Sequence, residues 1–513
     1  MSALARYFLA QGDQVSGSDA VGSEITEELG KMGAEIFIGQ NTLTSSGNNL
    51  ITSPQPSPSK REGDNPPNPH LRNGGENAKS PLAPLLQSGE QIDSVIYSAA
   101  VREDNPELVE ARRLGIKTQK YAEALGELTK EKYTIAISGM HGKSTTTAMI
   151  GLIMEKAGLD PTVIVGTKVR WNLNPPNPHL RNGGQDTNSS QPPLAKGGEN
   201  YSNFRAGKSR YLVIEADEYD KSILNYWPKI LALLNIEEEH LDTYTGGLTE
   251  IMETFERYIS HLPEGGALVA NEEDENVQKI FNFQFSIFNK NSNSKFKIQK
   301  YNSIVADGLN LKIPGRHNIS NANAALAVAR ILGIDEKIAV EALNEFNGTW
   351  RRMEYKGEVN GAKIYDDYGH HPTEIKATLE GARELLKNFN PHNPPLRNGE
   401  GKLWCVFQPH QYQRTYDLFD QFVSAFGAAD KIILLPIYSV AGREDEEIKK
   451  QVSLESLAKA LIANRKAQDA ENIIYLDNFY LAAEYLRKKL QAGDVCVIMG
   501  AGDVYKLTNQ LLI

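Results

Sequence analysis

The stretch ISGMHGKSTTTAMIG, Ile137–Gly151, decides how the chain folds. An apolar, β-branched run leads into Gly139, and a helical pattern follows from about Lys143. Glycines let backbone N–H groups turn inward around a phosphate, and the helix N-terminus adds a positive end. Lys143 supplies a cation for the phosphates, and the Ser144 hydroxyl suits Mg²⁺. The pattern predicts a nucleotide-binding strand–loop–helix unit rather than a chance glycine turn, although GxxGK[ST] alone is only moderately specific.

The same order of elements recurs along the chain. Each of several apolar runs rich in β-branched residues ends in a turn and is followed by a helical pattern. Buried strands that alternate with helices are typical of α/β proteins with parallel sheets. The runs are YLVIEADE (Tyr211–Glu218), ILALLNIE (Ile230–Glu237), AKIYDDYG (Ala362–Gly369), LWCVFQPH (Leu403–His410), KIILLPIY (Lys431–Tyr438) and DVCVIMGAGD (Asp494–Asp503).

Two strand ends after the phosphate loop carry metal-binding side chains. Glu215 closes the first strand, and His240 follows the second within NIEEEHLDTY. Mg²⁺ prefers oxygen ligands and usually keeps waters, so a carboxylate, an imidazole and the Ser144 hydroxyl form a plausible metal set. Each acidic cluster taken alone is more often a solvated loop, and only the nearby phosphate loop favours the metal.

Three segments break the α/β pattern. Residues from about 43 to 90, 172 to 206 and 388 to 401 are rich in Pro, Asn, Gly and Ser. The phrase NPPNPHLRNGG occurs in two of them, at Asn65–Gly75 and Asn174–Gly184, and a scrambled relative occupies Asn390–Gly401. Such composition buries too little apolar surface to offset its ordering entropy. We interpret the segments as disordered insertions in surface loops, encoded by copies of a mobile DNA repeat.

The composition narrows the class of protein. With 513 residues, 40% hydrophobic and 23% charged, the chain is an ordinary globular protein of two to four domains. A net charge of -10 argues against nucleic acid as the main partner. The sequence has no apolar run long enough to span a membrane and no signal-peptide pattern at its start. Cys405 and Cys496 lie in apolar runs, as buried thiols of a reducing cytoplasm do.

Specific phrases in a fixed order resemble the Mur ligase family. The most specific are HLDTY, DDYGHHPTEI and FQPHxYxRT, and the matching phrases cover most of the chain outside the insertions. The others are VSGSDA, SAAVREDNPELVEAR, SGMHGKSTTT, EADEYDKSIL, PGRHNISNANAALAVA, FNGTWRRME and MGAGD.

The resemblance implies three α/β domains. They are a Rossmann-like domain for a UDP-sugar over 1–127, a central phosphate-loop ATPase domain over 128–347, and a C-terminal Rossmann-like domain over 348–513. The three insertions would interrupt one domain each.

The resemblance also implies an ATP- and Mg²⁺-dependent ligase that joins L-alanine to UDP-N-acetylmuramate through an acyl phosphate. This reaction begins the peptide of the peptidoglycan wall and takes place in the cytoplasm. We expect no nucleic-acid partner and no membrane span, and the sequence leaves monomer and homodimer open.

Site residues carry over from the family motif by motif. The ATP phosphates would lie against Gly139, Met140, His141, Gly142, Lys143, Ser144 and Thr145. Mg²⁺ would be held by Ser144, Glu215 and His240. Asn318 and Asn321 would lie against the adenine, or else cap a helix, because an amide offers a donor and an acceptor.

The substrate groups follow from the remaining motifs. Asp366 and Asp367 would face the ribose and phosphates of ATP. His370, His371, His410 and Arg414 would gather at the substrate carboxylates, and Asp19 would face the uridine. Lys143, His240, His370, His371 and Arg414 would be the catalytic groups. Arg351 and Arg352 would either join them or form salt bridges at the domain junction.

The chain departs from the family pattern at four places. The family begins roughly GIGGIGMSALA, whereas this chain begins at MSALA. We expect the missing strand and glycine turn to be encoded just upstream. Ser144 replaces a threonine, Gln411 replaces a frequent arginine, and Phe255 stands where sister ligases carry a carbamylated lysine. We therefore expect no carbamate.

Two other functions stay open from the sequence. A murein-peptide recycling ligase shares the phosphate loop but joins a preformed tripeptide to the same sugar. An N-terminally incomplete protein could bind ATP without ligating anything.

Overall fold

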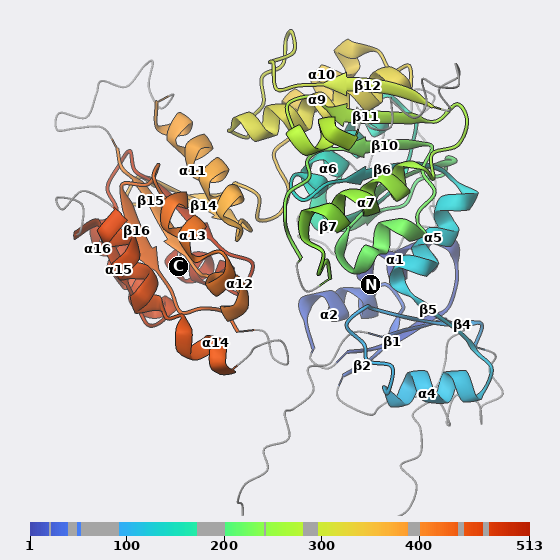
Figure 1. Cartoon of the computed structure of the whole chain (residues 1–513), viewed down its shortest axis with the longest axis horizontal. Coiled ribbons are helices and arrows are strands. Elements are labelled where there is room, and N and C mark those ends of the chain that lie inside the picture. Colours follow the sequence, from blue (N-terminus) through green and yellow to red (C-terminus); the bar gives the residue numbers. More distant parts are fainter. Residues whose placement is uncertain are drawn as a thin grey trace, which may run out of the picture. The chain divides into compact units, whose positions relative to one another are not determined.

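The computed structural model describes residues 1–19, 22–38, 49–52, 92–171, 201–240, 243–280, 296–387, 401–439, 446–464 and 471–512. These residues form two compact units. One comprises Met1–Met140, Gly158–Ala270 and Asp274–Gln299, and the other comprises His141–Ala157, Asn271–Glu273 and Lys300–Ile513. Figure 1 colours the chain by sequence and labels its elements. No helix in the described part of the chain is long and apolar enough to span a bilayer.

The N-terminal sheet is parallel throughout its described strands. Its helices are α1 (Ser2–Gln11), α2 (Glu24–Lys31) and α4 (Pro106–Arg113). The strand order is β2 (Glu35–Ile38), β1 (Val15–Asp19), β3 (Asn49–Thr52), β4 (Ser94–Tyr97) and β5 (Lys117–Lys120).

Local sequence signals fix where two of these helices begin. Ser23 precedes α2 and accepts a hydrogen bond from the Thr26 N–H, while Thr26 Oγ1 accepts one from the Ser23 N–H. Asn105 caps α4 through the N–H groups of Glu107 and Leu108, with proline at the first helical position. Such caps satisfy N–H groups that have no partner inside the helix.

The central sheet has the order β12 (Lys297–Tyr301), β11 (Ala267–Asn271), β10 (Ile230–Leu233), β6 (Tyr133–Ser138), β9 (Tyr211–Glu215), β7 (Thr162–Arg170) and β8 (Tyr201–Arg205). Apolar side chains of this sheet pack with those of α5 (Tyr121–Glu131), η1 (Tyr219–Asn225) and α7 (Gly247–Ile259) in one core cluster. Phe255, the position of the carbamylated lysine in sister ligases, is fully buried in that cluster. An apolar ring there leaves no amine to carbamylate.

The second unit contains three helices of the central region and the C-terminal sheet. The helices are α6 (Lys143–Lys156), α9 (Arg316–Ile331) and α10 (Glu336–Glu345). The sheet order is β13 (Glu354–Val359), β14 (Ala362–Asp367), β18 (Val495–Met499), β15 (Leu403–Phe407), β16 (Lys431–Leu434) and β17 (Ile473–Tyr475). All of its pairings are parallel except β13 with β14.

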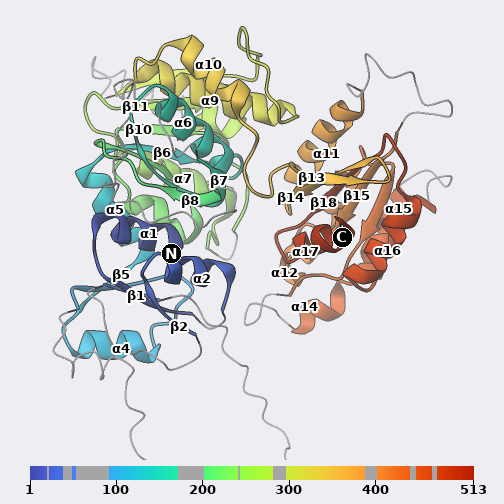
Figure 2. The same ribbon diagram turned by 180° about the vertical axis from the view of Figure 1, so that it is seen from behind.

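Helices cover both faces of the C-terminal sheet, and Figures 1 and 2 show the two sides. One face packs on α11 (Pro372–Lys387), α13 (Phe419–Ala425) and α15 (Leu454–Asn464). The other packs on α16 (Phe479–Lys489) and α17 (Tyr505–Leu512). The short helices α12 (Tyr412–Asp417) and α14 (Glu446–Gln451) complete the described helices of this domain.

Strand alternation separates the two cysteines. Cys405 and Cys496 are both fully buried and free. Cys405 belongs to the core on one face of the sheet and Cys496 to the core on the other. Side chains of adjacent residues in a strand point to opposite faces, and Cys496 pairs in register with Trp404 rather than with Cys405. The expectation of buried thiols instead of a disulfide is confirmed.

The strands expected from the apolar runs are present, but two insertion boundaries were wrong. Asn49–Thr52 forms β3, paired on both sides with β1 and β4, and Tyr201–Arg205 forms β8, antiparallel to β7. In both places ladder hydrogen bonds and β-prone residues outweigh the polar flanking composition. The third insertion also ends before Gly401, because this residue packs closely on the folded domain. An added Cβ at Gly401 would lie 1.9 Å from the Gly493 carbonyl oxygen. Residues 53–91, 172–200 and 388–400 lie outside the described residues.

The β7–β8 pair allows the second insertion to be tested. Arg170 pairs with Tyr201, and the buried Trp171 donates its indole N–H to the Ser202 carbonyl at 3.0 Å. The chain therefore leaves β7 and returns in β8 at adjacent points. Replacing residues 172–200 with a short Asn-Gly linker should shift the melting temperature by less than about 3 °C, because loop closure depends only logarithmically on length. Scanning calorimetry measures this, and a fall of about 10 °C would contradict it.

Candidate active site

The phosphate loop begins where β6 ends and finishes where α6 begins. Gly139 and Gly142 have φ angles of 134° and 83°, which side-chain-bearing residues rarely adopt. An added Cβ would lie 2.9 Å from the Asn235 carbonyl oxygen at Gly139 and 2.4 Å from Asn321 Oδ1 at Gly142. Both glycines are therefore needed for the turn. The expected strand–loop–helix unit is confirmed, with Lys143 at the first position of the helix.

Asn321 packs directly on the phosphate loop from α9. Its side chain is buried, and its amide lies 3.4 Å from the Asn318 carboxamide oxygen. Asn318 in turn donates to the Pro314 carbonyl at 2.6 Å. The N-cap of α9 is Gly315, without a side-chain cap, so the helix-capping alternative for the two asparagines is wrong. Their predicted contact with adenine stays a prediction.

Glu215 ends β9 with its carboxylate held by a neighbouring strand. Oε2 accepts the Gly166 N–H at 2.6 Å. An added Cβ at Gly166 would lie 2.9 Å from that oxygen and would push the carboxylate from this position. The backbone of β7 therefore orients Glu215, and its role as a metal ligand stays a prediction.

His240 lies beside two carboxylates that the sequence analysis did not name. Its Nε2 is 3.3 Å from Oε1 of Glu218, which is fully buried, and Glu239 joins them with ligand atoms within 4.8 Å of one another. Burial acts to lower the pKa of His240, but the hydrogen bond to Glu218 and the charges of Glu239, Glu218 and Asp217 raise it overall. The predicted metal set of Ser144, Glu215 and His240 stays a prediction, and the structure adds Glu218 and Glu239 beside the imidazole.

The donor set of this group fits a hard divalent cation. Two carboxylates and one imidazole leave room for waters, as Mg²⁺ requires. A buried carboxylate such as Glu218 also needs a compensating charge, which a cation or a protonated His240 supplies. Glu218, Glu239 and His240 would hold the ion, which would supply the positive charge that a phosphoryl oxygen needs during transfer.

Glu218→Gln tests this group without any assay of activity. We expect the affinity for Mn²⁺, followed by electron paramagnetic resonance, to fall about tenfold or more, because an anionic ligand is lost. Glu253→Gln, at an exposed carboxylate of α7, is the matched control and should bind Mn²⁺ like the parent chain. Equal affinity of the Glu218 variant and the parent would show that the ion is held elsewhere.

Asp366 and Asp367, at the end of β14, are engaged inside the protein. Asp366 is 2% exposed and lies 3.1 Å from Nε of Arg351, which is equally buried. Asp367 accepts the N–H groups of Met353 and Gly369, both at 2.8 Å. Burial raises the pKa of Asp366 to about 6 even though Arg351 opposes this. These partners support a structural role, and the predicted contact with ATP stays a prediction.

Arg351 and Arg352 have different environments. Arg351 donates to the carbonyls of Gly500 and Gly502, and its guanidinium lies 5.0 Å from the ring centre of Tyr505. Arg352 instead donates to Oε1 of Glu374 at 3.0 Å. Both arginines form salt bridges, and that of Arg351 lies inside the C-terminal domain rather than at a domain junction. A contact of either arginine with the substrate stays a prediction.

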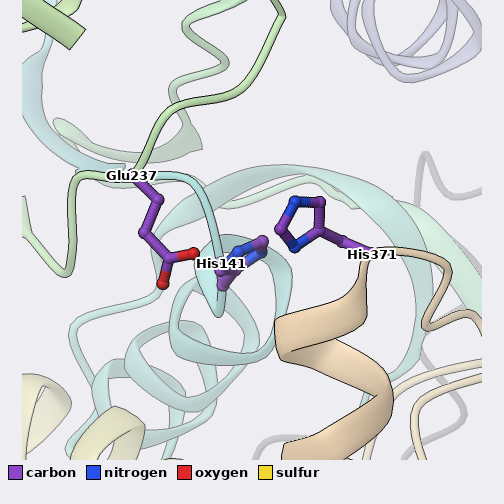
Figure 3. Close-up of side chains that lie close together, drawn as sticks. All are labelled: His141, Glu237 and His371. Atoms are coloured by element: carbon purple, nitrogen blue, oxygen red, sulfur yellow. The ribbon is translucent and has the colours of Figure 1, made fainter. Parts of the chain in front are cut away.

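A histidine cluster surrounds Glu374 at the start of α11. His370 Nδ1 lies 3.5 Å from Glu374 Oε2, and His141 Nδ1 lies 3.7 Å from Oε1. Figure 3 shows the His141 and His371 rings side by side, with centres 5.3 Å apart. His371 Nδ1 accepts the Thr373 N–H at 3.3 Å, so a neutral His371 ring carries its proton on Nε2. Burial lowers the pKa of His370 to about 3, which keeps this ring neutral.

His410 extends the cluster toward Arg414. Its ring stacks on Tyr438 at 5.4 Å and meets the His370 ring edge-on at 5.8 Å. Arg414 is close enough for its charge to lower the pKa of His370 further. Gln411, between them, has a φ of 70° and begins α12. The structure therefore brings together His141, His370, His371, His410 and Arg414 from motifs far apart in the sequence.

The predicted uridine contact of the N-terminal domain lies at the end of β1. Asp19 is its last residue, and the preceding Ser18 hydroxyl lies 3.1 Å from both carboxylate oxygens of Glu107. Glu107 is 7% exposed, and burial raises the pKa of its carboxyl to about 7 despite the Ser18 hydrogen bond. The predicted contact of Asp19 with uridine stays a prediction.

The Glu107 carboxyl makes stability depend on pH. Its folded pKa of about 7 exceeds the ordinary value of 4.5, so folding takes up a proton between these values. The contribution of the Glu107 carboxyl to the free energy of unfolding is fully present below pH 4.5. It is lost as the pH rises through 7. Glu107→Gln keeps the shape without the charge. Between pH 5 and 8, the free energy of unfolding of the parent chain should fall by up to about 3 kcal/mol relative to that of this variant. Urea unfolding measures both values. A difference that does not change with pH would contradict this.

Four carboxylates were missed by the sequence analysis. All of them lie inside quoted motifs: Glu218 in EADEYDKSIL, Glu239 in NIEEEHLDTY, Glu374 in DDYGHHPTEI and Glu107 in SAAVREDNPELVEAR. A glutamate on a helix or in a loop is normally solvated, so nothing local marked them. Their position within the specific phrases was the only available signal.

Family models match almost the whole chain. The Mur ligase family catalytic domain matches residues 1–133, the Mur ligase middle domain matches 137–329, and the Mur ligase glutamate ligase domain matches 351–502.

Curated relatives match along the full length. A UDP-N-acetylmuramate–L-alanine ligase of Clostridium acetobutylicum is 34% identical over 530 aligned positions, covering 100% of this chain and 95% of the relative. The enzyme of the same name from Acetivibrio thermocellus is 35% identical, with 100% and 93% covered.

Solved structures share the fold. The crystal structure of a UDP-N-acetylmuramate–alanine ligase from Thermotoga maritima gives a TM-score of 0.66 at 22% identity, covering 100% of this chain and 95% of that one. A murein peptide ligase from Psychrobacter arcticus gives 0.58, also at 22% identity and with the same coverage. These likenesses agree with the three sheets described above.

Proposed function

The chain belongs to the Mur ligase family, and we propose that it joins L-alanine to UDP-N-acetylmuramate at the expense of ATP. The observation that carries this proposal is the agreement of full-length relatives, 34–35% identical, that bear this one activity in their names. The phosphate loop between β6 and α6 supports the ATP dependence. The reaction would take place in the cytoplasm and begin the peptide of the peptidoglycan wall.

The reaction needs a carboxylate to become an electrophile. A free carboxylate resists attack because it lacks a good leaving group. Transfer of the γ-phosphoryl group of ATP to the lactyl carboxylate would give an acyl phosphate and ADP. The amine of L-alanine then attacks the carbonyl carbon, phosphate leaves, and the amine loses a proton as the amide forms.

The residues of the site suit these demands. Bringing an anionic carboxylate to a triphosphate requires positive charge, which Lys143, the N-terminus of α6 and the cation of the Glu218–Glu239–His240 group would supply. His370 stays neutral, so its ring would contribute a polar contact at the site rather than a charge. Arg414 would hold the substrate carboxylate, and Asp19 would face the uridine.

Neither alternative function is favoured. The recycling ligase is represented among the fold neighbours at 22% identity, which speaks for the fold alone. The curated relatives with 34–35% identity carry the alanine-joining name instead. The same relatives, which bear a ligase activity in their names, also disfavour a protein that only binds ATP.

Phosphate release by the full chain tests the proposal. With ATP, Mg²⁺ and UDP-N-acetylmuramate, we expect release to depend on L-alanine and not on the stem tripeptide. Tripeptide-dependent release would instead identify the recycling ligase, and phosphate release that no acceptor stimulates would contradict both ligases.

Lys143→Ala tests the phosphate loop in the same assay. Loss of the loop cation should reduce kcat about 100- to 1000-fold, because transition-state charge is left unbalanced. Lys337→Ala, at an exposed lysine of α10, is the control and should retain the parent kcat. A Lys143 variant that kept the parent kcat would remove the loop from the mechanism.

A further inference from the structure

Glu374 is a carboxylate that contacts both His141 of the phosphate loop and the histidine segment of the C-terminal domain. Its side chain is 11% exposed. Oε1 accepts the Arg352 guanidinium at 3.0 Å and faces His141 Nδ1 at 3.7 Å. Oε2 accepts the His370 N–H at 3.0 Å and the His371 N–H at 3.3 Å. The two oxygens therefore have different partners: Oε1 contacts side chains, and Oε2 contacts backbone N–H groups.

The contacts of Oε2 are those of a helix start. Glu374 lies in the first turn of α11, which begins at Pro372, and its carboxylate satisfies backbone N–H groups just before the helix. This task needs an acceptor but no net charge. A glutamine in the same place would satisfy it almost equally well.

The contacts of Oε1 reach beyond the helix. His141 lies between Gly139 and Gly142, so its side chain extends from the turn that would enclose the phosphates. Arg352 is near enough, together with His141 and His370, to hold the pKa of Glu374 well below its usual range, although burial opposes this. Glu374 also faces His317, whose ring stays neutral because burial and Arg352 lower its pKa to about 4. Glu374 is thus an anion that holds Arg352 and His141 together.

A buried anion beside a triphosphate site would repel the nucleotide unless it were matched. The positive charge of Arg352 offsets this anion. Burial acts to lower the pKa of Arg352, but the charges of Glu374 and Asp367 raise it overall. Because the charges of Glu374 and Arg352 offset each other, the pair hardly repels ATP. The carboxylate also fixes the position of the Arg352 guanidinium. Misplacing such a group by about 1 Å can reduce a rate about 100-fold.

We infer that Glu374 is a positioning residue of the ligase reaction, which holds Arg352 and His141 in the places that phosphoryl transfer requires. The inference rests on the proposed function, and it assigns the carboxylate of the DDYGHHPTEI phrase a role apart from starting α11. Glu374 acts through these two side chains rather than on the substrate.

Glu374→Gln separates the two tasks, because it keeps an acceptor for the backbone and removes the charge. We expect a melting temperature no more than about 10 °C below the parent, because the Arg352 side chain is 30% exposed and stays partly solvated. We also expect a kcat about tenfold to 100-fold lower and a KM for UDP-N-acetylmuramate within about twofold. The full chain is assayed by alanine-dependent phosphate release. Glu380→Gln, at an exposed carboxylate of the same helix, is the control and should retain the parent kcat.

A double-mutant cycle with His141→Gln tests whether Glu374 acts through His141. If it does, adding Glu374→Gln to His141→Gln should lower kcat by a clearly smaller factor than adding it to the parent chain, because only the part that acts through Arg352 is left. Full additivity of the two losses would overturn the inference, as would a Glu374→Gln variant with the parent kcat. If kcat falls in Glu374→Ala but not in Glu374→Gln, and the melting temperature of Glu374→Ala falls as well, then Glu374 only stabilises the start of α11.

The outcome can be separated from failure of the proposed function. If the parent chain itself shows no alanine-dependent release, the ligase proposal fails, and the cycle is then measured on the affinity for a fluorescent ATP analogue. Coupling between the two positions in that affinity would support the positioning role alone. Independent effects on the affinity would overturn it.

Discussion

A buried guanidinium organises the C-terminal domain. Arg351 is 2% exposed and has a left-handed backbone conformation with a φ of 56°. Its donors reach Asp366 on β14 and two carbonyls of the loop after β18, and three aromatic rings lie within 5.7 Å of it. Losing one partner of such a buried pair costs about 3–5 kcal/mol, because the other charge is left without compensation. The end of β14, and the histidine segment that follows it, therefore depend on this contact.

The same constraint recurs around the other strand ends. A carboxylate removed from water needs donors, and the structure supplies them from the backbone for Glu215 and Asp367 and from a guanidinium for Glu374. Parallel strands bring their carboxyl ends to one edge of each sheet, where loops carry polar side chains. Polar groups that are buried but paired have fixed positions. A site that must align two anionic substrates benefits from such fixed positions.

Much of the fold followed from residues close in sequence. The apolar runs gave the strands β6, β9, β10, β14, β15, β16 and β18, and the glycines of Ile137–Gly151 gave the turn before α6. The strands β3 and β8 were placed inside insertions, because their polar surroundings resemble linkers and only the ladder partners show them to be strands. The asparagines of α9 were recognised, but their placement beside Gly142 depends on how α9 packs with α6.

The sequence alone determined the α/β class, the phosphate loop and the family, since period, glycine spacing and specific phrases are local properties of the chain. Only the tertiary structure decided which acids are buried and what neutralises them. Ser18 meets Glu107 across 89 positions of sequence, and His141 meets Glu374 from a different motif altogether. Burial and charge pairing depend on neighbours in space, and those neighbours exist only after the sheets and helices have packed.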